Sequence, residues 1–254
     1  MKIATWNVNS LRVRLPHVLE WLDRECPDVL ALQETKSEDA NFPVAELESA
    51  GYRPVFSGQK TYNGVAILSR QPAVDVVTDL PDLEDPQRRI LAATVDDWRI
   101  IDLYVPNGSE VGSDKYAYKL DWLAHVHAWL RGQLLCYPKL VVLGDFNIAP
   151  QDSDVHDPAA WREKILCSTL ERQAFDGLLA LGLKDAFRCF EQPEKSFSWW
   201  DYRMNGFRRN LGLRIDHILI SSPLVQSCRS CRVDVAPRKL ERPSDHAPVV
   251  AEFG

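Results

Sequence analysis

The feature that most limits how this chain can fold is a series of short apolar runs, several of them unbroken stretches of Val, Ile and Leu. Runs of this kind are typical of β-strands that are covered on both faces. Two sheets packed together, with helices outside, would bury all of these strands. The predicted strands span residues 2–7, 28–33, 64–69, 99–106, 139–145, 214–221 and 248–253.

Segments whose apolar residues have helical spacing lie between these strands. Apolar residues recur at intervals of three and four over residues 15–22, 118–135 and 171–181, which predicts amphipathic helices there. The segments follow one another without a Pro-, Gly- or Ser-rich linker and without a repeat period. We therefore predict a mixed α/β fold in which residues 1–254 form a single domain.

Composition narrows the class of protein. The 254 residues contain no apolar stretch approaching the roughly 18 residues that a membrane helix requires. The first residues have strand character and no signal-peptide pattern, so we expect a cytoplasmic protein that does not contact membranes. The six cysteines are scattered, and Cys228 and Cys231 have C-x-x-C spacing without a second pair nearby. We expect reduced thiols and no zinc.

Charge is distributed unevenly along the chain. The net charge of −6 argues against bulk attraction to nucleic acid. Residues 201–242 nevertheless carry nine basic side chains, Arg208 and Arg209 among them, against four acidic ones, and Trp199, Trp200 and other aromatic residues lie within or beside this basic segment. The segment is interpreted either as a solvated face or as a surface that contacts nucleic acid.

Polar side chains stand where the apolar runs end or are interrupted. Ligand-binding and catalytic groups of α/β proteins collect at strand ends. Taken singly, these residues have ordinary explanations, such as a helix cap, an Asx turn or a buried histidine. Separate caps would have no reason to adopt this combination of types, so we predict one shared site. Its members are Asn7, Asn9, Glu34, Tyr104, Asp145, Asn147, Asp216, Asp245 and His246.

The chemistry of the set favours hydrolysis of a phosphodiester. Glu34 and Asp245, with Asn7 or Asn9, offer hard oxygen ligands suited to Mg²⁺ or Mn²⁺. Asp145 can orient and deprotonate a water, and Asn147 and Tyr104 can contact developing charge or a phosphate. A His246 held protonated by a carboxylate can bind a phosphate oxygen. The motifs of serine hydrolases, P-loop proteins and Rossmann folds are missing from the sequence.

Five blocks in order resemble the exonuclease III / AP endonuclease family of the endonuclease/exonuclease/phosphatase superfamily. The blocks are WNVNSLR at 6–12, LQETK at 32–36, GDFN at 144–147, GLRID at 212–216 and SDHAP at 244–248. The resemblance implies a four-layer α/β sandwich of two packed mixed β-sheets flanked by α-helices. It also implies an Mg²⁺-dependent DNA-repair nuclease that acts in base excision repair, at abasic sites and at DNA 3′ ends. The oligomeric state is left open by the sequence, with a monomer as the default for an enzyme that must wrap a duplex.

Position by position, the resemblance also implies roles. Glu34 is expected to be the principal metal ligand, with Asn7 and Asp245 around it and Asp145, Asn147 and His246 completing the set. Asp145 is expected to activate the water, with Asn147 as transition-state donor. Asp216 is expected to orient His246, and Tyr104 to be the active-site tyrosine. Trp199, Leu213 and Ile215 match a pocket for a flipped abasic sugar, and Arg208 and Arg209 are expected to contact DNA phosphates.

Two positions depart from the family pattern. Glu110 stands in a loop where some members place an arginine toward DNA, and Leu166 stands in a loop that borders the substrate site. A bulky Leu166 would crowd the strand that continues past an internal lesion while sparing a 3′ terminus. The alternative hypothesis is therefore a specialised 3′–5′ exonuclease with little internal cleavage. Two further hypotheses are a superfamily relative that acts on different phosphoesters and a catalytically inactive binding module.

Overall fold

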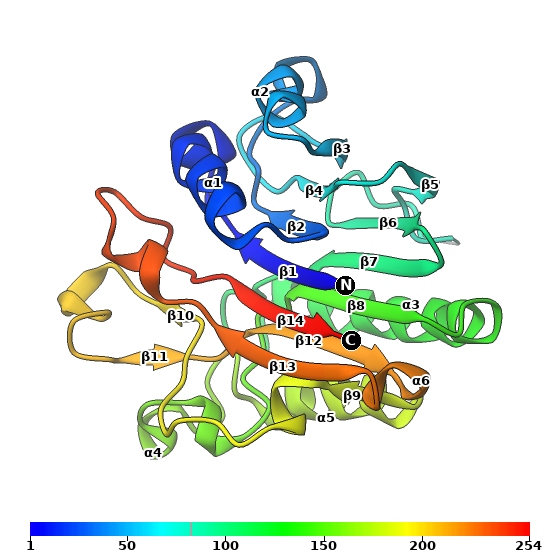
Figure 1. The fold of residues 1–254 in the computed structure, drawn as a ribbon. Helices are drawn as coiled ribbons and strands as arrows, with labels where there is room; N and C mark the ends of the chain where they lie inside the picture. The colour runs from blue at the N-terminus through cyan, green and yellow to red at the C-terminus, as the bar shows by residue number, and fades with distance from the viewer. Residues whose placement is uncertain (82) are drawn as a thin grey trace.

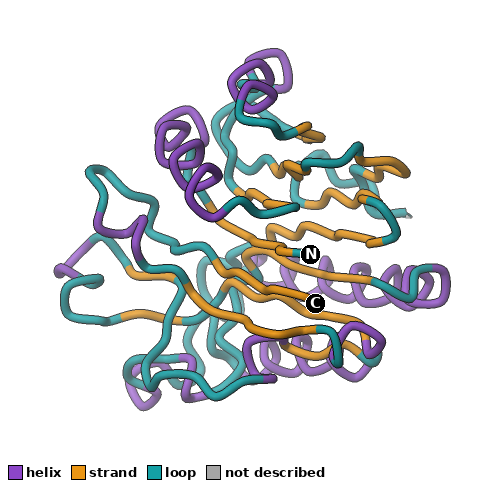
Figure 2. Tube along the Cα trace, in the orientation of Figure 1, coloured by secondary structure: helices purple, strands orange, loops and turns teal. Residues whose placement is uncertain are grey.

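Two six-stranded sheets form the centre of the molecule. The computed structural model describes residues 1–81 and 83–254 of the chain. The sheets lie against each other with helices on their outer sides (Figure 1). The expected two-sheet α/β sandwich is confirmed, and Figure 2 shows the strands gathered between the helices.

The first sheet has the order β13-β14-β1-β2-β4-β3. Its centre is the parallel pair of β1 and β2, and the other neighbours are antiparallel. The two chain termini lie together because the amide of Phe253 donates to the carbonyl of Met1 at 2.8 Å. The strands are β1 (Lys2–Asn7), β2 (Val29–Gln33), β3 (Arg53–Ser57), β4 (Val65–Ser69), β13 (Cys228–Val233) and β14 (Val249–Phe253).

The second sheet has the order β5-β6-β7-β8-β12-β9. It too has one parallel pair, β7 and β8, near its centre. The strands are β5 (Ala73–Val77), β6 (Ile90–Val95), β7 (Trp98–Tyr104), β8 (Leu140–Asp145), β9 (Leu183–Asp185) and β12 (Asp216–Ser221). A parallel pair needs a crossover connection, and here a helix lies between β1 and β2 and another between β7 and β8.

Helices cover the outer faces. The longer ones are α1 (Leu11–Glu25), α3 (Asp114–Cys136) and α5 (Thr169–Ala180), and the shorter ones are α2 (Val44–Ser49), α4 (Pro158–Trp161) and α6 (Ser222–Val225). Helices α1 and α2 bury apolar side chains against the first sheet, and α3 and α5 do so against the second. In the described part of the chain, every helix is too short or too polar to cross a bilayer.

Three apolar layers result. Between the sheets, residues such as Ile67, Leu143 and Ile218 are fully buried. Strands with side chains buried on both faces explain the unbroken apolar runs. All seven predicted strands and all three predicted helices are confirmed, with ends that differ by a few residues.

The sequence interpretation missed other strands. These are β3, β5, β6, β9 and β13, together with the short hairpin of β10 (Trp199–Trp200) and β11 (Gly212–Leu213). Several of them lie at sheet edges, where exposed side chains break the apolar pattern; β5, for example, is exposed along its middle. The β10–β11 hairpin projects from one side of the sandwich (Figure 1).

Candidate active site

Polar residues from both sheets meet at one end of the sandwich. They follow or end β1, β2, β7 and β8, begin β12, and precede β14. They surround a cavity of about 330 Å³. The polar residues that line it are Glu34, Tyr104, Asn107, Asp145, Asn147, Asp201, Arg203, Asp245 and His246.

Glu34, Asp145 and His246 form a cluster of possible metal ligands at this end. Each offers a ligand atom within 4.8 Å of the others. The side-chain amide of Asn7 donates to both Glu34 Oε1 and Asp145 Oδ2, at 2.9 Å each. Lys36 Nζ lies 2.9 Å from Glu34 Oε2. Two buried or half-buried carboxylates that face one cavity are suited to a hard divalent cation.

Asp216 and His246 form a buried pair. His246 Nδ1 lies 2.9 Å from Asp216 Oδ2, and His246 Nε2 lies 3.8 Å from Asp145 Oδ2. Burial alone would lower the pKa of His246, but the carboxylates of Asp216 and Asp145 outweigh it and raise the pKa to about 10. Ser198 also donates to Asp216 Oδ2, at 2.6 Å, and helps to hold the carboxylate in place. His246 is therefore a cation that faces the cavity.

Asp145 is the carboxylate at the centre. Its Oδ1 accepts from the backbone amide of Asn147 at 2.9 Å, and its Oδ2 accepts from Asn7. Burial raises the pKa of Asp145 to about 7, although the charge on His246 opposes the shift. A carboxylate that is costly to ionise in the free protein would be stabilised by a bound cation. The donor set therefore fits a divalent metal ion.

The cavity is also lined by Asn147, Tyr104 and Asp245. The amide of Asn147 donates to the carbonyl of Val105 at 3.0 Å. Burial and the neighbouring charges of Glu34 and Asp145 raise the pKa of Tyr104 well above its usual value, so its phenol stays neutral. Asp245 accepts from Asn9 and from Trp199 Nε1, at 2.9 and 3.0 Å.

The backbone at these strand ends takes unusual conformations. Asn9, Glu34, Lys36 and Asn147 all have φ between 45° and 51°. Non-glycine residues seldom occupy this left-handed region, and clusters of them are typical of functional sites. The turns at Glu34 and Asn147, which follow β2 and β8, aim these side chains at one cavity, an arrangement that residue types alone do not reveal.

An apolar wall faces the carboxylates. Leu166, Ile215 and Trp199 line the cavity. Leu213, predicted to join this pocket, packs in the same cluster but is fully buried, behind the cavity surface. Trp161, at the end of α4, and Ile165, in the loop after it, also line the cavity; they were missed because this short segment carries no regular apolar pattern.

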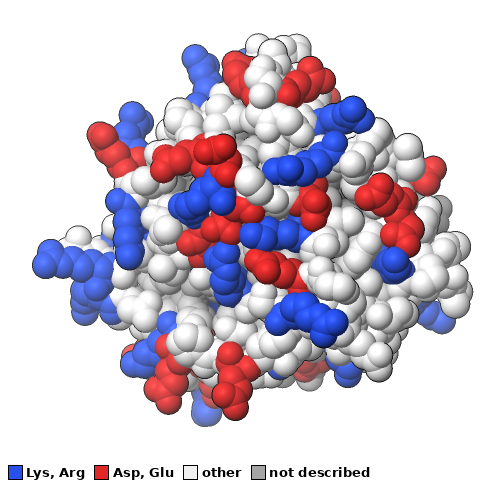
Figure 3. All heavy atoms as spheres, viewed as in Figure 1, with Lys and Arg blue, Asp and Glu red and all other residues white. Residues whose placement is uncertain are grey.

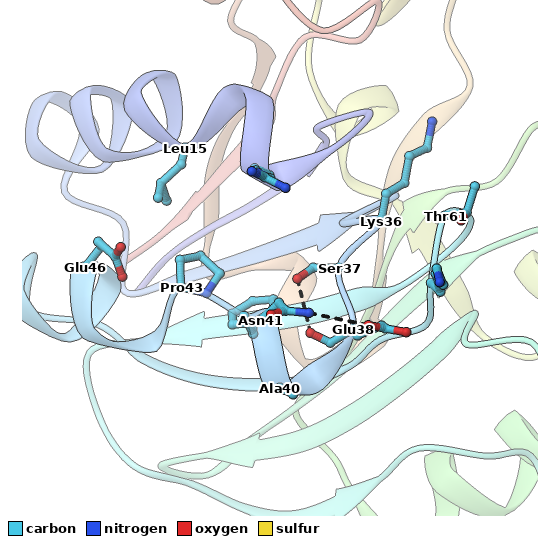
Figure 4. Close-up of a pocket in the computed structure, with 12 residues that line it drawn as sticks. Leu15, Lys36, Ser37, Glu38, Ala40, Asn41, Pro43, Glu46 and Thr61 are labelled. Atoms are coloured by element: carbon cyan, nitrogen blue, oxygen red, sulfur yellow. Dashed lines mark hydrogen bonds between the residues drawn. The ribbon is translucent and has the colours of Figure 1, made fainter.

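Arg208 and Arg209 lie outside the cavity. Both are exposed in the loop between β10 and β11. Lys and Arg side chains cover this projecting edge, at the left of the molecule (Figure 3). A second hollow, of about 640 Å³, lies beside Lys36 between α1 and the segment that includes α2 (Figure 4). Arg12 and Lys60 also line it.

Comparisons with known proteins find similar chains over the whole length of the protein. Residues 4–246 match the endonuclease/exonuclease/phosphatase family. An exodeoxyribonuclease III from Haemophilus influenzae is 37% identical, with both chains covered completely.

Solved structures match closely as well. A 3′ phosphatase, NExo, from Neisseria bound to a product DNA hairpin is 52% identical with a TM-score of 0.98, covering 100% of this chain and 99% of that one. NExo from Neisseria meningitidis is also described as a 3′–5′ exonuclease. An AP endonuclease from Archaeoglobus fulgidus is 40% identical with a TM-score of 0.96, over 100% of this chain and 99% of that one.

Replacing Asp216 with Asn should lower the pKa of His246 from its value of about 10, because the nearest carboxylate charge is removed. A folded-state pKa above the unfolded one stabilises the fold fully below the unfolded pKa and loses this effect as pH rises through the folded pKa. Asp216→Asn should therefore be less stable than wild type by the full amount below about pH 6.5, and this difference should shrink as the pH rises from 6.5 to 10. Imidazole NMR titration in EDTA measures the pKa. His217, whose pKa is lowered to about 4 by burial and Arg214, is the internal reference, and an unmoved His246 titration would contradict the assignment.

Proposed function

Since the chain belongs to the endonuclease/exonuclease/phosphatase family, we propose that it is an Mg²⁺-dependent DNA-repair nuclease that hydrolyses phosphodiester bonds at abasic sites and at DNA 3′ ends. The observation that carries the proposal is the convergence of Glu34, Asp145 and His246 within 4.8 Å on one cavity. An apolar wall faces this cluster across the same cavity, which suits a phosphate attached to a sugar.

Glu34 and Asp145 are the residues that would hold the metal ion. Asn7 donates to both carboxylates and keeps them facing each other. A divalent cation bound there would neutralise charge on the phosphate and activate water. His246 is better suited to donate hydrogen bonds than to ligate, because it is cationic beside Asp216. Asp245 and Asn147 lie around the same cavity and are proposed as outer members of the set.

The proposed reaction uses the protein's own groups in distinct roles. Asp145, held by Asn7 and the backbone amide of Asn147, accepts a proton from the attacking water. His246 donates to a phosphate oxygen and opposes the charge that develops there. The neutral phenol of Tyr104 provides a further donor on the cavity wall. Asn147, whose side-chain amide is bonded to Val105 and Asp145, would donate to the phosphate by exchanging one of these bonds. Asp216 keeps His246 oriented and charged.

The surroundings of the cavity favour a DNA substrate. Trp199 and Ile215 offer an apolar surface for a sugar without a base, with Leu213 supporting them from behind. Extruding such a sugar from the duplex costs little. The exposed Arg208 and Arg209 would contact backbone phosphates without reading sequence. Arg12, Lys36 and Lys60 line the second hollow together with Glu38 and Glu46, and these three basic side chains offer further contacts to backbone phosphates.

Asp145→Asn should lower the rate of DNA hydrolysis by roughly a thousandfold or more, because the variant keeps the shape of the site but loses the proton acceptor. The measurement uses a duplex with a labelled, recessed 3′ end, with Mg²⁺ and with EDTA. Asp176→Asn, on helix α5, is the matched control and should equal wild type. Equal activity of Asp145→Asn and wild type, or full wild-type activity in EDTA, would overturn the proposal.

A preference for 3′ ends over internal abasic sites is the second candidate function. Leu166 is 4% exposed, lines the cavity, and holds a left-handed φ of 71°. A leucine forced into this conformation fills space beside the scissile position that a continuing strand would need. The 52% identical Neisseria protein, described as a 3′ phosphatase and 3′–5′ exonuclease, supports this alternative.

Leu166→Gly should raise the ratio of internal abasic cleavage to 3′ degradation by about tenfold, because the obstruction is removed and a small change in substrate position has a large effect on rate. Glycine also fits the backbone at φ 71°, so the fold should be kept. Both substrates are assayed in one tube. Leu170→Ala, at a position 52% exposed on α5, is the control; an unchanged ratio in Leu166→Gly would assign Leu166 to packing alone.

A further inference from the structure

A fully buried ion pair lies directly behind the active-site cavity. Lys119 of α3 and Glu171 of α5 have side chains that are 0% exposed, and Lys119 Nζ lies 2.5 Å from Glu171 Oε1. Burying two charges is costly, and an apolar pair of similar volume is often at least as stable. The pair is therefore expected to do more than join two helices.

The ammonium group of Lys119 binds the backbone of the site. Besides Glu171, Nζ donates to the carbonyl of Asn147 at 2.7 Å and to the carbonyl of Asn107 at 3.2 Å. All three hydrogens of the ammonium are used. One carbonyl belongs to the proposed transition-state donor, and the other to a loop residue that lines the cavity.

The carboxylate of Glu171 binds the loop that carries Leu166. Oε1 accepts from the amide of Leu166 at 3.1 Å, and Oε2 accepts from the amide and hydroxyl of Ser168 at 3.1 and 2.6 Å. The carboxylate thus receives four hydrogen bonds, the one from Lys119 included. Ser168 is further fixed by the hydroxyl of Tyr116 at 2.7 Å. This set of bonds holds the left-handed turn at Leu166 in place.

The two halves of the pair join two strained turns. Asn147 has φ 50° and Leu166 has φ 71°, and each has a main-chain group bonded to the pair. The turns are also bonded directly to each other, since the amide of Ala149 donates to the carbonyl of Leu166 at 2.7 Å. A Cβ on Gly108 would lie 2.9 Å from Ile165 Cδ1 and 3.1 Å from Lys119 Cδ, so the loop above the lysine is packed tightly onto it.

We propose that the Lys119–Glu171 pair is a positioning element that sets the substrate preference of the site, by fixing the Leu166 turn at a constant distance from the catalytic turn at Asn147. The proposal rests on the proposed function, because a preference exists only if DNA is cleaved. Neither residue touches the substrate in this account. Both act through Leu166 and Asn147.

Glu171→Gln tests the proposal with little change of volume. An amide group can replace only one carboxylate oxygen as an acceptor, so the amides of Leu166 and Ser168 cannot both keep their partners. The ratio of internal abasic cleavage to 3′ degradation, measured on two labelled duplexes in one tube, should rise about fivefold. Partial unfolding lowers both rates equally and leaves the ratio unchanged. Glu163→Gln is the matched control, because Glu163 bonds Thr169 at the start of the same helix without contacting Leu166.

A double variant separates positioning from packing. In a Leu166→Gly background the turn carries no bulky side chain, so adding Glu171→Gln should leave the ratio within about twofold of the single glycine variant. Lys119→Met combined with Glu171→Gln removes both charges and should raise the ratio at least as much as Glu171→Gln alone. This inference alone would be overturned if Glu171→Gln had the same ratio of internal abasic cleavage to 3′ degradation as wild type. It would also be overturned if Glu171→Gln changed that ratio by the same factor in the Leu166→Gly background. A wild-type protein that cleaves neither duplex with Mg²⁺ would overturn the proposed function as well.

Discussion

The burial of carboxylates around one cationic imidazole is the constraint on which the active site depends. Asp145 and Asp216 are nearly or fully buried at the end of the second sheet, where ionised groups are costly. His246 reaches them from the loop before β14, in the first sheet, and its charge compensates theirs. The two sheets must pack in one register for this to happen. The packing of the two sheets therefore also determines the electrostatics of the site.

The continuous apolar runs predicted most of the inner strands, because burial on both faces leaves an unbroken apolar pattern; β6 was missed although it is buried along its length. Polar residues at the ends of those runs predicted the members of the cavity, since Glu34, Asp145 and His246 do meet. Edge strands such as β5 were not predictable, because solvent on both sides removes the pattern. The Lys119–Glu171 pair was also hidden, because a lysine and a glutamate in helices are ordinarily surface residues and only tertiary packing buries them.

The strained turns that line the cavity are held by buried polar groups behind them. The positive-φ turns at Glu34, Asn147 and Leu166 aim side chains toward the cavity. Behind the cavity, the buried Ser198 donates to Asp216, and the buried Glu171 accepts from the amide of Leu166. Sites held this way keep catalytic groups in place before the substrate arrives. The same rigidity would let a single side chain, Leu166, discriminate between a strand that ends and one that continues.

The most direct test of this account measures the cleavage of two end-labelled duplexes by purified wild-type protein in one tube, with Mg²⁺ and with EDTA. One duplex carries an internal abasic analogue, and the other a recessed 3′ end without a lesion. The account predicts cleavage that requires Mg²⁺, and the ratio of 3′ shortening to internal cutting measures how far Leu166 obstructs a strand that continues past the lesion. The account would be contradicted if neither duplex were cleaved with Mg²⁺, or if cleavage continued unchanged in EDTA.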